Sequence, residues 1–592
     1  MRKPASYYEF GPFLLDVAER RLLRDGQTIP LTRRAFETLL VLVQNNGRVI
    51  EKGELMKKIW QDSFVEEATL AQNIFTLRKI LEERPNEIQY IETVPKYGYR
   101  FVAKVNEWSD ERQEEVSKKS TEPDREIRSL AVLPFTLLMP GEDYEHFGIA
   151  MADALITKLS NVKKISVRPT SAILKYAHQN QDSISIGKEL KVKLVLEGKI
   201  ILFGDRMRVT LQLIHVQEGI PLWADKFDEK LSDIFTLQDK ISEQILKVLT
   251  LKLTSSERKL LAKHPTENSE AYQEYIKGRH QWNKWTEQGF QRSIQYFERA
   301  FELDLNYALS HAGISDAYNA LAFYGLLSPL EAMPRAKVAA QRALEIDDSL
   351  AEAHLSLAAV LFFYHWNWPE AEKEFNRALE LNPDYATAYQ GYGLYLIALG
   401  RFDEALAMLK RSLELDPASL LINTTLGFPY YFAGQYDEAI KQYRKALEMD
   451  PTFGLAHLAL GDVYVHKQMP GEAIAEYKKA VELLGQSPDA LGSLGYAYAI
   501  SDKTSEAKRI ITKLKKISKY RYISQVAMAV IYTGLGEKGQ ALDWLEKGLE
   551  AHSNKLVYLN VNPIFNTIRS DRRYLDLLRR LGFASDPPLE SR

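Results

Sequence analysis

The carboxy-terminal half of the chain repeats itself with a period of 34 residues. Glycine keeps this step from Gly393 to Gly495, and proline keeps it from Pro383 to Pro451. Alanine keeps it over the longest run, at Ala371, Ala405, Ala439, Ala473, Ala507 and Ala541. A fixed period in three residue types indicates a solenoid, in which each unit buries its apolar face against its neighbours.

The unit is identified as a tetratricopeptide repeat, which consists of two helices and a turn over 34 residues. Only Gly or Ala fits where paired helices approach closely, while Tyr430, Tyr464 and Tyr498 can fill the space between neighbours. The Asp-Pro and Asn-Pro steps should end each second helix, because the residue before proline is pushed out of the α region. We expect about eight repeats over residues 270–554 and a segment over residues 555–592 that caps the last helix.

Length and composition indicate several globular domains. A chain of 592 residues exceeds what one hydrophobic core usually supports, and its 45% hydrophobic and 26% charged residues are close to globular averages. Cysteine is absent, which excludes disulfides, thiolate metal ligands and a cysteine nucleophile. Residues 1–10 lack an apolar signal sequence, and no stretch approaches the ~18 apolar residues of a membrane helix. We therefore expect a cytoplasmic protein with no membrane partner.

A charged linker and a small α/β domain are predicted before the array. Residues 105–128 carry many charges and few large apolar side chains, so they cannot bury enough surface to fold alone. Residues 129–254 should form the α/β domain. Apolar patterns predict its strands and helices, with strands at 129–135, 193–203 and 206–216 and helices at 146–161 and 233–253. The blocks SLAVLPF, GIAMADALITKLSN and LEGKI of this domain resemble the amino-terminal domain of TolB.

Residues 1–104 combine short strands with amphipathic helices. Thr32 can cap a first helix, and Leu55, Ile59 and Trp60 give a second amphipathic one. In a third helix, apolar residues fall at positions i, i+4, i+7 and i+11, namely Leu70, Ile74, Leu77 and Leu81. One stripe of this helix should therefore be buried, which leaves the opposite face free.

Three blocks of this domain resemble the OmpR/PhoB-type winged helix: LTRRAFETLLVLVQNNGRVIEKGELMKKIW, LAQNIFTLRKIL and IETVPKYGYRF. Its amino-terminal place in the chain is similar to that in CadC/ToxR-like regulators. The resemblance implies that the third helix enters the major groove of double-stranded DNA and that the wing meets the backbone or the minor groove. The candidate DNA-binding side chains are Thr69, Gln72, Asn73, Thr76, Arg78 and Lys79 on the helix and Lys96 and Arg100 in the wing.

Other interpretations of this domain stay open. The family often places Arg or Lys where this chain has Phe75 and Thr76, which weakens the expected grip on phosphates. A polar helix face is often only a solvated surface. Winged helices also serve as contacts between proteins, so a protein partner is the main alternative to DNA.

The sequence shows no motif of an enzyme. The GxxxxGK[ST] phosphate loop, the GxSxG elbow, the HExxH zinc pair and the GxGxxG fingerprint are all missing. Asp153 and Asp205 could serve as metal carboxylates, but a helix face and a turn account for them better. We expect no catalytic residue, no cofactor and no metal, and therefore no enzyme. Chemistry hidden in the α/β domain is the alternative.

The concave groove of the array is expected to hold a protein or peptide partner. Some tetratricopeptide domains clamp acidic peptide ends with Lys and Arg at positions where this chain has residues such as Gln390 and Leu394. An apolar or mixed segment should therefore fit better. Phe428, Tyr431 and Phe432 are the candidate anchors, although core packing would explain the same aromatic stripe.

These patterns predict a multidomain chain with an α+β winged helix-turn-helix, a small α/β domain and an all-α tetratricopeptide solenoid. The predicted function is transcription regulation, in which the winged helix reads promoter DNA and the array binds a protein partner or signal. RNA polymerase is a further candidate partner. The alternative is a scaffold or assembly protein whose winged helix contacts protein.

Overall fold

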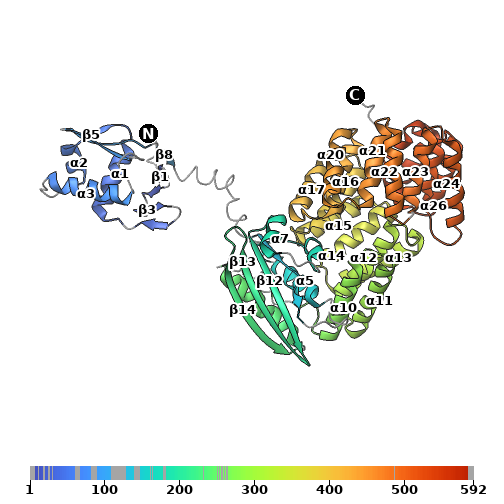
Figure 1. Cartoon of the computed structure of the whole chain (residues 1–592), viewed down its shortest axis with the longest axis horizontal. Helices are drawn as coiled ribbons and strands as arrows, with labels where there is room; N and C mark the ends of the chain where they lie inside the picture. The colour runs from blue at the N-terminus through green and yellow to red at the C-terminus, as the bar shows by residue number, and fades with distance from the viewer. Residues whose placement is uncertain are drawn as a thin grey trace. The chain divides into compact units, whose positions relative to one another are not determined.

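The computed structural model of the chain describes most of residues 7–108 and 129–583 (Figure 1). The described residues form two units, within residues 1–124 and 125–592, and each unit is considered by itself. The gaps inside the described ranges are residues 11–12, 18–19, 25–26, 30, 60–66, 82–89, 96, 104, 139–146, 161, 163–164, 178–181, 231–232, 250, 252–253, 255–257, 259–260, 262–263 and 486.

An antiparallel sheet opens the amino-terminal unit. Its strand order is β4-β3-β2-β1-β8, and its strands are β1 (Tyr7–Phe10), β2 (Phe13–Asp16), β3 (Arg21–Arg24), β4 (Gln27–Ile29) and β8 (Asn106–Trp108). In the pairing of β8 with β1, Trp108 lies opposite Tyr7. The folded unit therefore extends beyond residue 104, and the predicted linker begins later than residue 105. The charged sequence of residues 105–128 does not predict this strand. Backbone pairing at a sheet edge requires no apolar side chain, so the apolar pattern gives no sign of it.

Helices and a second sheet complete this unit. They are α1 (Arg33–Gln44), α2 (Lys52–Ile59) and α3 (Glu67–Ile80), with strands β5 (Val49–Glu51), β6 (Ile91–Val94) and β7 (Gly98–Phe101) in the order β5-β7-β6. As its sequence position predicts, the Thr32 hydroxyl caps α1 by accepting a hydrogen bond from the Ala35 N–H at 3.3 Å. A Cβ atom at Gly98 would lie 1.9 Å from the carbonyl oxygen of Ile50. Glycine at this position therefore lets β7 approach β5 closely.

The carboxy-terminal unit begins with a mixed sheet of order β11-β9-β12-β13-β14, with β10 paired to β12. Its strands are β9 (Ser129–Val132), β10 (Thr136–Leu137), β11 (Ser166–Val167), β12 (Leu194–Phe203), β13 (Arg206–His215) and β14 (Ile220–Lys230). β12 and β13 form the predicted hairpin around Gly204, whose φ of +58° favours glycine. The sequence pattern does not predict β14, because mostly exposed residues leave it without apolar alternation.

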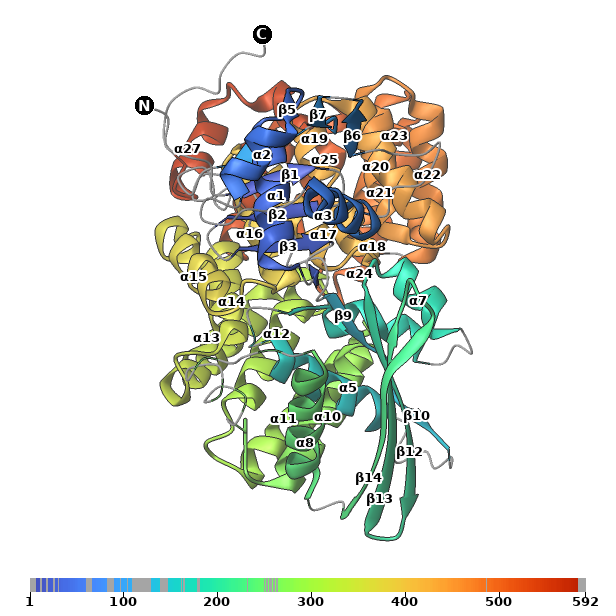
Figure 2. The same ribbon diagram turned by 90° about the vertical axis from the view of Figure 1, so that its left-hand side faces the viewer.

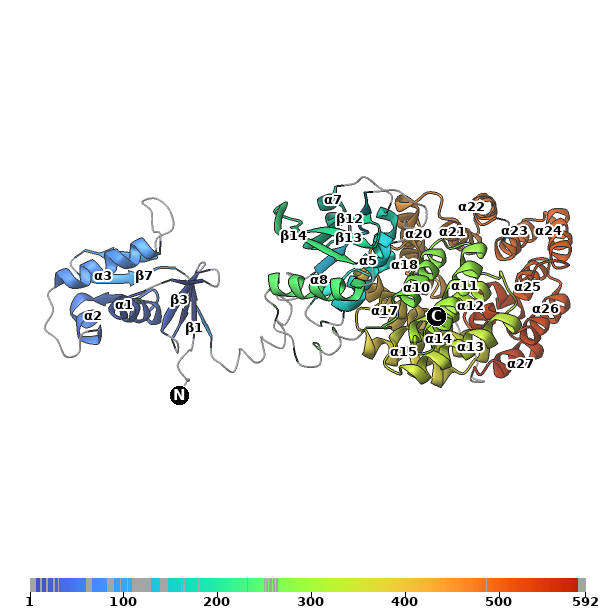
Figure 3. The same ribbon diagram turned by 90° about the horizontal axis from the view of Figure 1, so that it is seen from below.

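Helices α5 (Phe147–Ser160) and α8 (Ile234–Val248) lie side by side on this sheet (Figure 2 and Figure 3). Met151 and Ile241 on these helices are fully buried, as is Leu196 on β12. The same core includes Tyr272 and Tyr275 of the first helix of the array. The α/β domain and the array therefore share one continuous core.

The rest of the unit is a helical array. Its helices are α10 (Ser269–Trp282), α11 (Glu287–Leu303), α12 (Ala308–Phe323), α13 (Pro329–Ile346), α14 (Ala351–Val360), η5 (Leu361–His365), α15 (Trp368–Leu381), α16 (Ala386–Ala398), α17 (Phe402–Leu415), α18 (Leu420–Thr425), α19 (Phe428–Phe432), α20 (Tyr436–Met449), α21 (Gly454–His466), α22 (Pro470–Leu483), α23 (Pro488–Ile500), α24 (Thr504–Ile517), α25 (Gln525–Gly534) and α26 (Lys538–Glu550). A Cβ atom at Gly427 would lie 2.1 Å from Cε1 of Tyr443, and one at Gly461 would lie 2.5 Å from Cε1 of Tyr477. The periodic glycines thus admit the aromatic ring of the paired helix.

The segment after α26 reaches back to the middle of the array. It consists of η6 (Asn554–Tyr558), η7 (Pro563–Ile568) and α27 (Arg572–Arg580). α27 contacts α26, as the capping prediction requires. In addition, the indole N–H of Trp368 donates to the carbonyl oxygen of Leu581 at 2.7 Å, although the two residues are 213 positions apart. The segment therefore covers the last helix and also joins it to an earlier repeat.

Candidate nucleic-acid interface and array cavity

α3 turns one stripe into the core and leaves the opposite face in solvent. Leu70, Ile74 and Leu77 are at most 1% exposed, which confirms the buried stripe that the sequence predicts. The opposite face carries exposed or half-buried polar side chains, at Thr69, Gln72, Asn73, Thr76 and Lys79. The structure therefore brings these five predicted contacts together on one surface.

The polar groups on this face suit the edges of base pairs. The amides of Gln72 and Asn73 each offer a donor and an acceptor, which is the combination that adenine presents in the major groove. The Thr76 hydroxyl donates to the Gln72 carbonyl oxygen at 2.9 Å, and its oxygen keeps its capacity to accept. Lys79 is exposed and can neutralise a phosphate.

Arg78 differs from the other predicted contacts because it binds the wing. Its Nη2 donates to the carbonyl oxygen of Ile91 and to Oγ1 of Thr93, in both cases at 2.8 Å. Ile91 and Thr93 belong to β6. The guanidinium of Arg78 therefore holds α3 against the wing.

The wing consists of β6, β7 and the turn that joins them. Tyr97 lies in this turn and is 66% exposed, whereas Lys96 lies outside the described residues. Arg100 sits on β7 opposite Glu92, and its Nε and Nη2 donate to Glu92 Oε2 at 2.8 and 2.6 Å. This ion pair offsets part of the positive charge that the resemblance assigns to the wing.

Phe75 shares the outward face of α3 with these polar groups. The sequence marks it only as a departure from the resembling family, which often has Arg or Lys near positions 75 and 76. In the structure its side chain is 63% exposed. Its helical position places it between Gln72 and Lys79, so it belongs to the same surface as the predicted base contacts.

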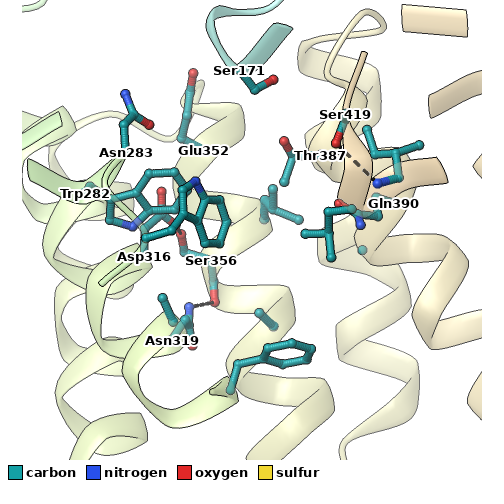
Figure 4. A pocket seen from close by; sticks show the side chains of 18 of the residues that line it. Ser171, Trp282, Asn283, Asp316, Asn319, Glu352, Ser356, Thr387, Gln390 and Ser419 are labelled. Atoms are coloured by element: carbon teal, nitrogen blue, oxygen red, sulfur yellow. Dashed lines mark hydrogen bonds between the residues drawn. The ribbon is translucent and has the colours of Figure 1, made fainter. Parts of the chain in front are cut away.

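In the carboxy-terminal unit, the array and the α/β domain line a cavity of about 2140 Å³ (Figure 4). Asp316 and Gln390 lie on opposite walls of the part that Figure 4 shows. Ser171 enters from α6 (Thr170–Ile173) of the α/β domain. The predicted groove of the array is therefore partly covered by the preceding domain.

Hydrogen bonds join the α/β domain to the array beside this cavity, where Arg168 and Asp416 are buried and Ser171 is exposed. The Ser171 hydroxyl donates to Oδ2 of Asp416 at 2.6 Å. The Arg168 guanidinium donates to the carbonyl oxygens of Leu190 at 2.9 Å and Leu415 at 3.4 Å. Because Leu415 and Asp416 lie at the end of α17, these bonds fix an array turn against the α/β domain.

The three candidate aromatic anchors line the cavity with different degrees of burial. Tyr431 is 5% exposed and belongs to the core of the array. Phe432 is half-buried and stacks on Tyr558, with ring centroids 5.9 Å apart and planes 11° apart. Phe428 is half-buried and meets Tyr443 edge-on at 6.3 Å. Core packing therefore accounts for Tyr431, whereas the other two rings remain partly accessible.

Carboxyl groups also line the cavity, and the sequence analysis does not single them out. Burial raises the pKa of Asp316 to about 6, although the Ser356 hydroxyl donates a hydrogen bond to it. Burial likewise raises the pKa of Glu352. Nη1 of Arg279 lies 3.9 Å from Oδ2 of Asp316. These residues come from three separate helices, so no local pattern could show that they share one cavity.

The two carboxylates considered as metal ligands lie in separate surroundings. Asp153 accepts a hydrogen bond from the Thr170 hydroxyl, and Asp205 lies in the turn between β12 and β13. Among the described residues, no group of His, Asp and Glu side chains could hold a metal ion. None of the described helices has both the length and the apolar character needed to cross a membrane.

Comparison with known proteins assigns the parts of the chain. The family model "Transcriptional regulatory protein, C terminal" matches residues 26–101. The model for the second domain of HilA/YgeH-like transcriptional regulators matches residues 126–244. Tetratricopeptide models match residues 349–418, 429–468 and 456–483. The chain has the domain organisation of a transcriptional regulator. These matches confirm the predicted OmpR/PhoB-type and tetratricopeptide parts of the regulator, while the likeness of its middle domain to TolB stays a prediction.

The relatives match different shares of the regulator. The transcriptional regulator HilA of Salmonella typhi is 25% identical over 408 residues, which are 67% of this chain and 68% of HilA. The transcriptional activator CadC of Escherichia coli is 32% identical over 114 residues, 19% of this chain and 22% of CadC. A Rhizobium meliloti protein whose name assigns it provisionally to the adenylate cyclases is 28% identical over 238 residues, 39% of this chain and 40% of that protein. The regulator thus has its longest match among these three with HilA.

Proposed function

We propose that the regulator binds double-stranded promoter DNA through α3 and the wing, and that its array cavity binds a segment of a partner protein. We propose DNA binding because of the side chains on the outward face of α3. It presents amide and hydroxyl groups opposite a buried apolar stripe, in a domain that matches a family of transcriptional regulatory proteins. A helix with one such free face can lie in the major groove while its other face stays packed.

The proposed contacts divide into three roles. Base edges are assigned to the amide and hydroxyl side chains of α3, at Thr69, Gln72, Asn73 and Thr76. Phosphates are assigned to Lys79 on α3 and to Lys96 and Arg100 in the wing. Arg78 is assigned to the position of the wing, because its guanidinium donates to Ile91 and Thr93.

The partner of the array is proposed to be a segment with both apolar and basic side chains. Phe428 and Phe432 offer partly accessible rings for the apolar side chains. Buried carboxyls such as Asp316 and Glu352 are stabilised in their charged form by a nearby cation. A regulator at a promoter works in the cytoplasm beside RNA polymerase, so a polymerase subunit is one candidate source of the segment.

Electrophoretic mobility of random duplex DNA with the full-length regulator tests the first part. Binding should be clear at low salt and should weaken steeply as salt rises, because the bound protein displaces counterions from phosphates. Duplexes enriched from the pool should share a common sequence. A regulator that shows no affinity for DNA even at low salt would contradict the proposal and favour the scaffold alternative.

Crosslinking from inside the cavity tests the second part. A photoreactive amino acid replaces Phe428 in the full-length regulator, and the same group replaces Tyr520 as a control, since Tyr520 is 74% exposed and does not line the cavity. Crosslinks from position 428 should fall on one partner segment that contains Lys or Arg beside apolar residues. Equal labelling from both positions, or a crosslinked segment rich in Asp and Glu, would contradict the proposed partner chemistry.

A further inference from the structure

We propose that Phe75 is a specificity-determining residue of the DNA interface and that its ring contacts the methyl group of a thymine in the major groove. The inference rests on the proposed function, because it requires that α3 reads DNA. We draw it from the 63% exposure of the Phe75 side chain within the outward face of α3.

The place of Phe75 on the helix puts its ring among the proposed contacts. Phe75 follows Gln72 by three positions and precedes Lys79 by four, and residues at these spacings are neighbours on a helix surface. Both neighbours are exposed. A complex in which Gln72 reaches a base edge and Lys79 reaches a phosphate therefore brings the Phe75 ring against the same stretch of groove.

The fold gives no reason for a large apolar residue at this position. The core contact of α3 is made by Leu70, Ile74 and Leu77, which are buried. Among the described residues of this unit, Phe75 is neither in the core nor among the partly buried hydrophobic residues that pack against it. Single exposed apolar residues are common on protein surfaces, and Phe75 differs from them because it lies between Gln72 and Lys79 on the proposed DNA-contacting face.

The chemistry of the major groove favours thymine as the contact. The groove edges carry hydrogen-bond donors and acceptors, and the C5 methyl group of thymine is their apolar feature. A phenyl ring cannot satisfy a donor or an acceptor, so contact with other polar edges would desolvate them without compensation. A phenylalanine at position 75 therefore favours the recognition of an A·T pair over a contact with phosphate.

Deoxyuridine provides a direct test because it differs from thymidine only by the missing methyl group. Duplexes that the full-length regulator selects from a random pool are prepared with each thymine in turn replaced by deoxyuridine. One or two replacements should weaken binding about fourfold, the effect expected when one buried methyl group is lost. Phe75→Ala should bind the thymine and deoxyuridine duplexes equally, and Phe75→Leu should keep part of the difference.

Val102→Ala is the matched control, because Val102 is 43% exposed on the same unit and lies outside α3. This variant should keep the fourfold preference for thymine. Phe75→Ala should unfold at the temperature of the wild type, because the ring is exposed. Equal binding of both duplexes by the wild type would overturn the inference and leave the proposed function intact. An unchanged thymine preference in Phe75→Ala would overturn it as well, since another side chain would then read the methyl group. Failure of the wild type to bind DNA at low salt would overturn the proposed function itself.

Discussion

The outward face of α3 and the array cavity use polar side chains in opposite ways. On α3, Gln72 and Lys79 stand in solvent and come from one short helix. In the cavity, burial raises the pKa values of Asp316 and Glu352, which come from separate helices. Substitutions on α3 should therefore change binding with little effect on folding, whereas substitutions around the cavity should change both.

The largest expected effect is a loss of stability in the carboxy-terminal unit that leaves DNA binding unchanged. Gly427→Val places side-chain atoms where even a Cβ atom would lie 2.1 Å from Tyr443, so the free energy of unfolding of the carboxy-terminal unit should fall by about 3 kcal/mol. Urea unfolding followed by circular dichroism measures this loss. DNA affinity below the unfolding transition should stay unchanged.

Gly471→Val is the control for this effect, because a Cβ atom at Gly471 meets nothing within 4 Å. Its unfolding free energy should stay within about 0.5 kcal/mol of the wild type. The comparison breaks down if both glycine variants lose equal stability, or if DNA affinity falls together with the stability of the array.

The next effect belongs to α3 and concerns sequence discrimination. Asn73→Ala should lower the preference for the correct base pair at one position by roughly 1–3 kcal/mol, because a bidentate amide contact is lost. Affinities for single-base variants of a selected duplex measure it, and thermal unfolding should not change. Gln44→Ala removes an exposed amide at the end of α1 and should leave discrimination intact. A uniform loss of affinity for every sequence would assign Asn73 to the backbone instead.

A dependence of stability on pH should mark the cavity. Asp462 of α21 lines this cavity. Burial raises its pKa to about 7, so the folded state binds this proton more tightly than the unfolded chain. The contribution of Asp462 to stability should therefore be greatest below about pH 4, fall between about pH 4 and pH 7, and level off above that range. Urea unfolding at pH 5 and pH 8 should show a more stable array at pH 5.

Asp462→Asn should reduce this difference by about 1–2 kcal/mol, because the amide does not titrate. Asp437→Asn is the control, since Asp437 is exposed and its pKa is lowered by the hydrogen bond from Lys467. It should not reduce the advantage at pH 5. An Asp462→Asn variant with the full difference between pH 5 and pH 8 would show that other groups produce it.

The smallest effect concerns the wing. Arg100→Ala should weaken binding to all duplexes by about two- to threefold and lower the salt slope by about 1, because one phosphate contact is lost. Glu92→Gln should strengthen binding to all duplexes, since it releases Arg100 from its ion pair and removes a negative charge. Salt titrations of both variants measure the effect. Changes of the same sign in both variants would contradict this account of the wing.

The sequence predicts features that depend on local periodicity. The stripe of Leu70, Ile74 and Leu77 and the glycines of the array follow from the spacing of residues in one helix or in successive units. The ion pair of Arg100 with Glu92 depends on the register of two strands, which no apolar pattern specifies.

The sequence does not predict contacts between distant segments. The carboxyls of the cavity are brought together by the curvature of the array, and the bond from Ser171 to Asp416 joins two domains. Arg78 is a predicted DNA contact, but its guanidinium donates to the backbone of β6. The spacing of residues does not show this bond, since α3 and β6 meet only in the folded unit. Composition and residue spacing do not show which distant segments come into contact.

The bond from Trp368 to Leu581 changes how the array can come apart. In an open solenoid each repeat contacts only its neighbours, so the terminal repeat can fray while the others stay folded. Here the terminal segment ends on a repeat 213 positions earlier, and Phe583 packs against the same Trp368 ring with centroids 4.8 Å apart. Release of the last turn therefore exposes the middle of the array at the same time. Its unfolding should be a single cooperative event that spans both, and not a gradual peeling from the carboxy-terminal end.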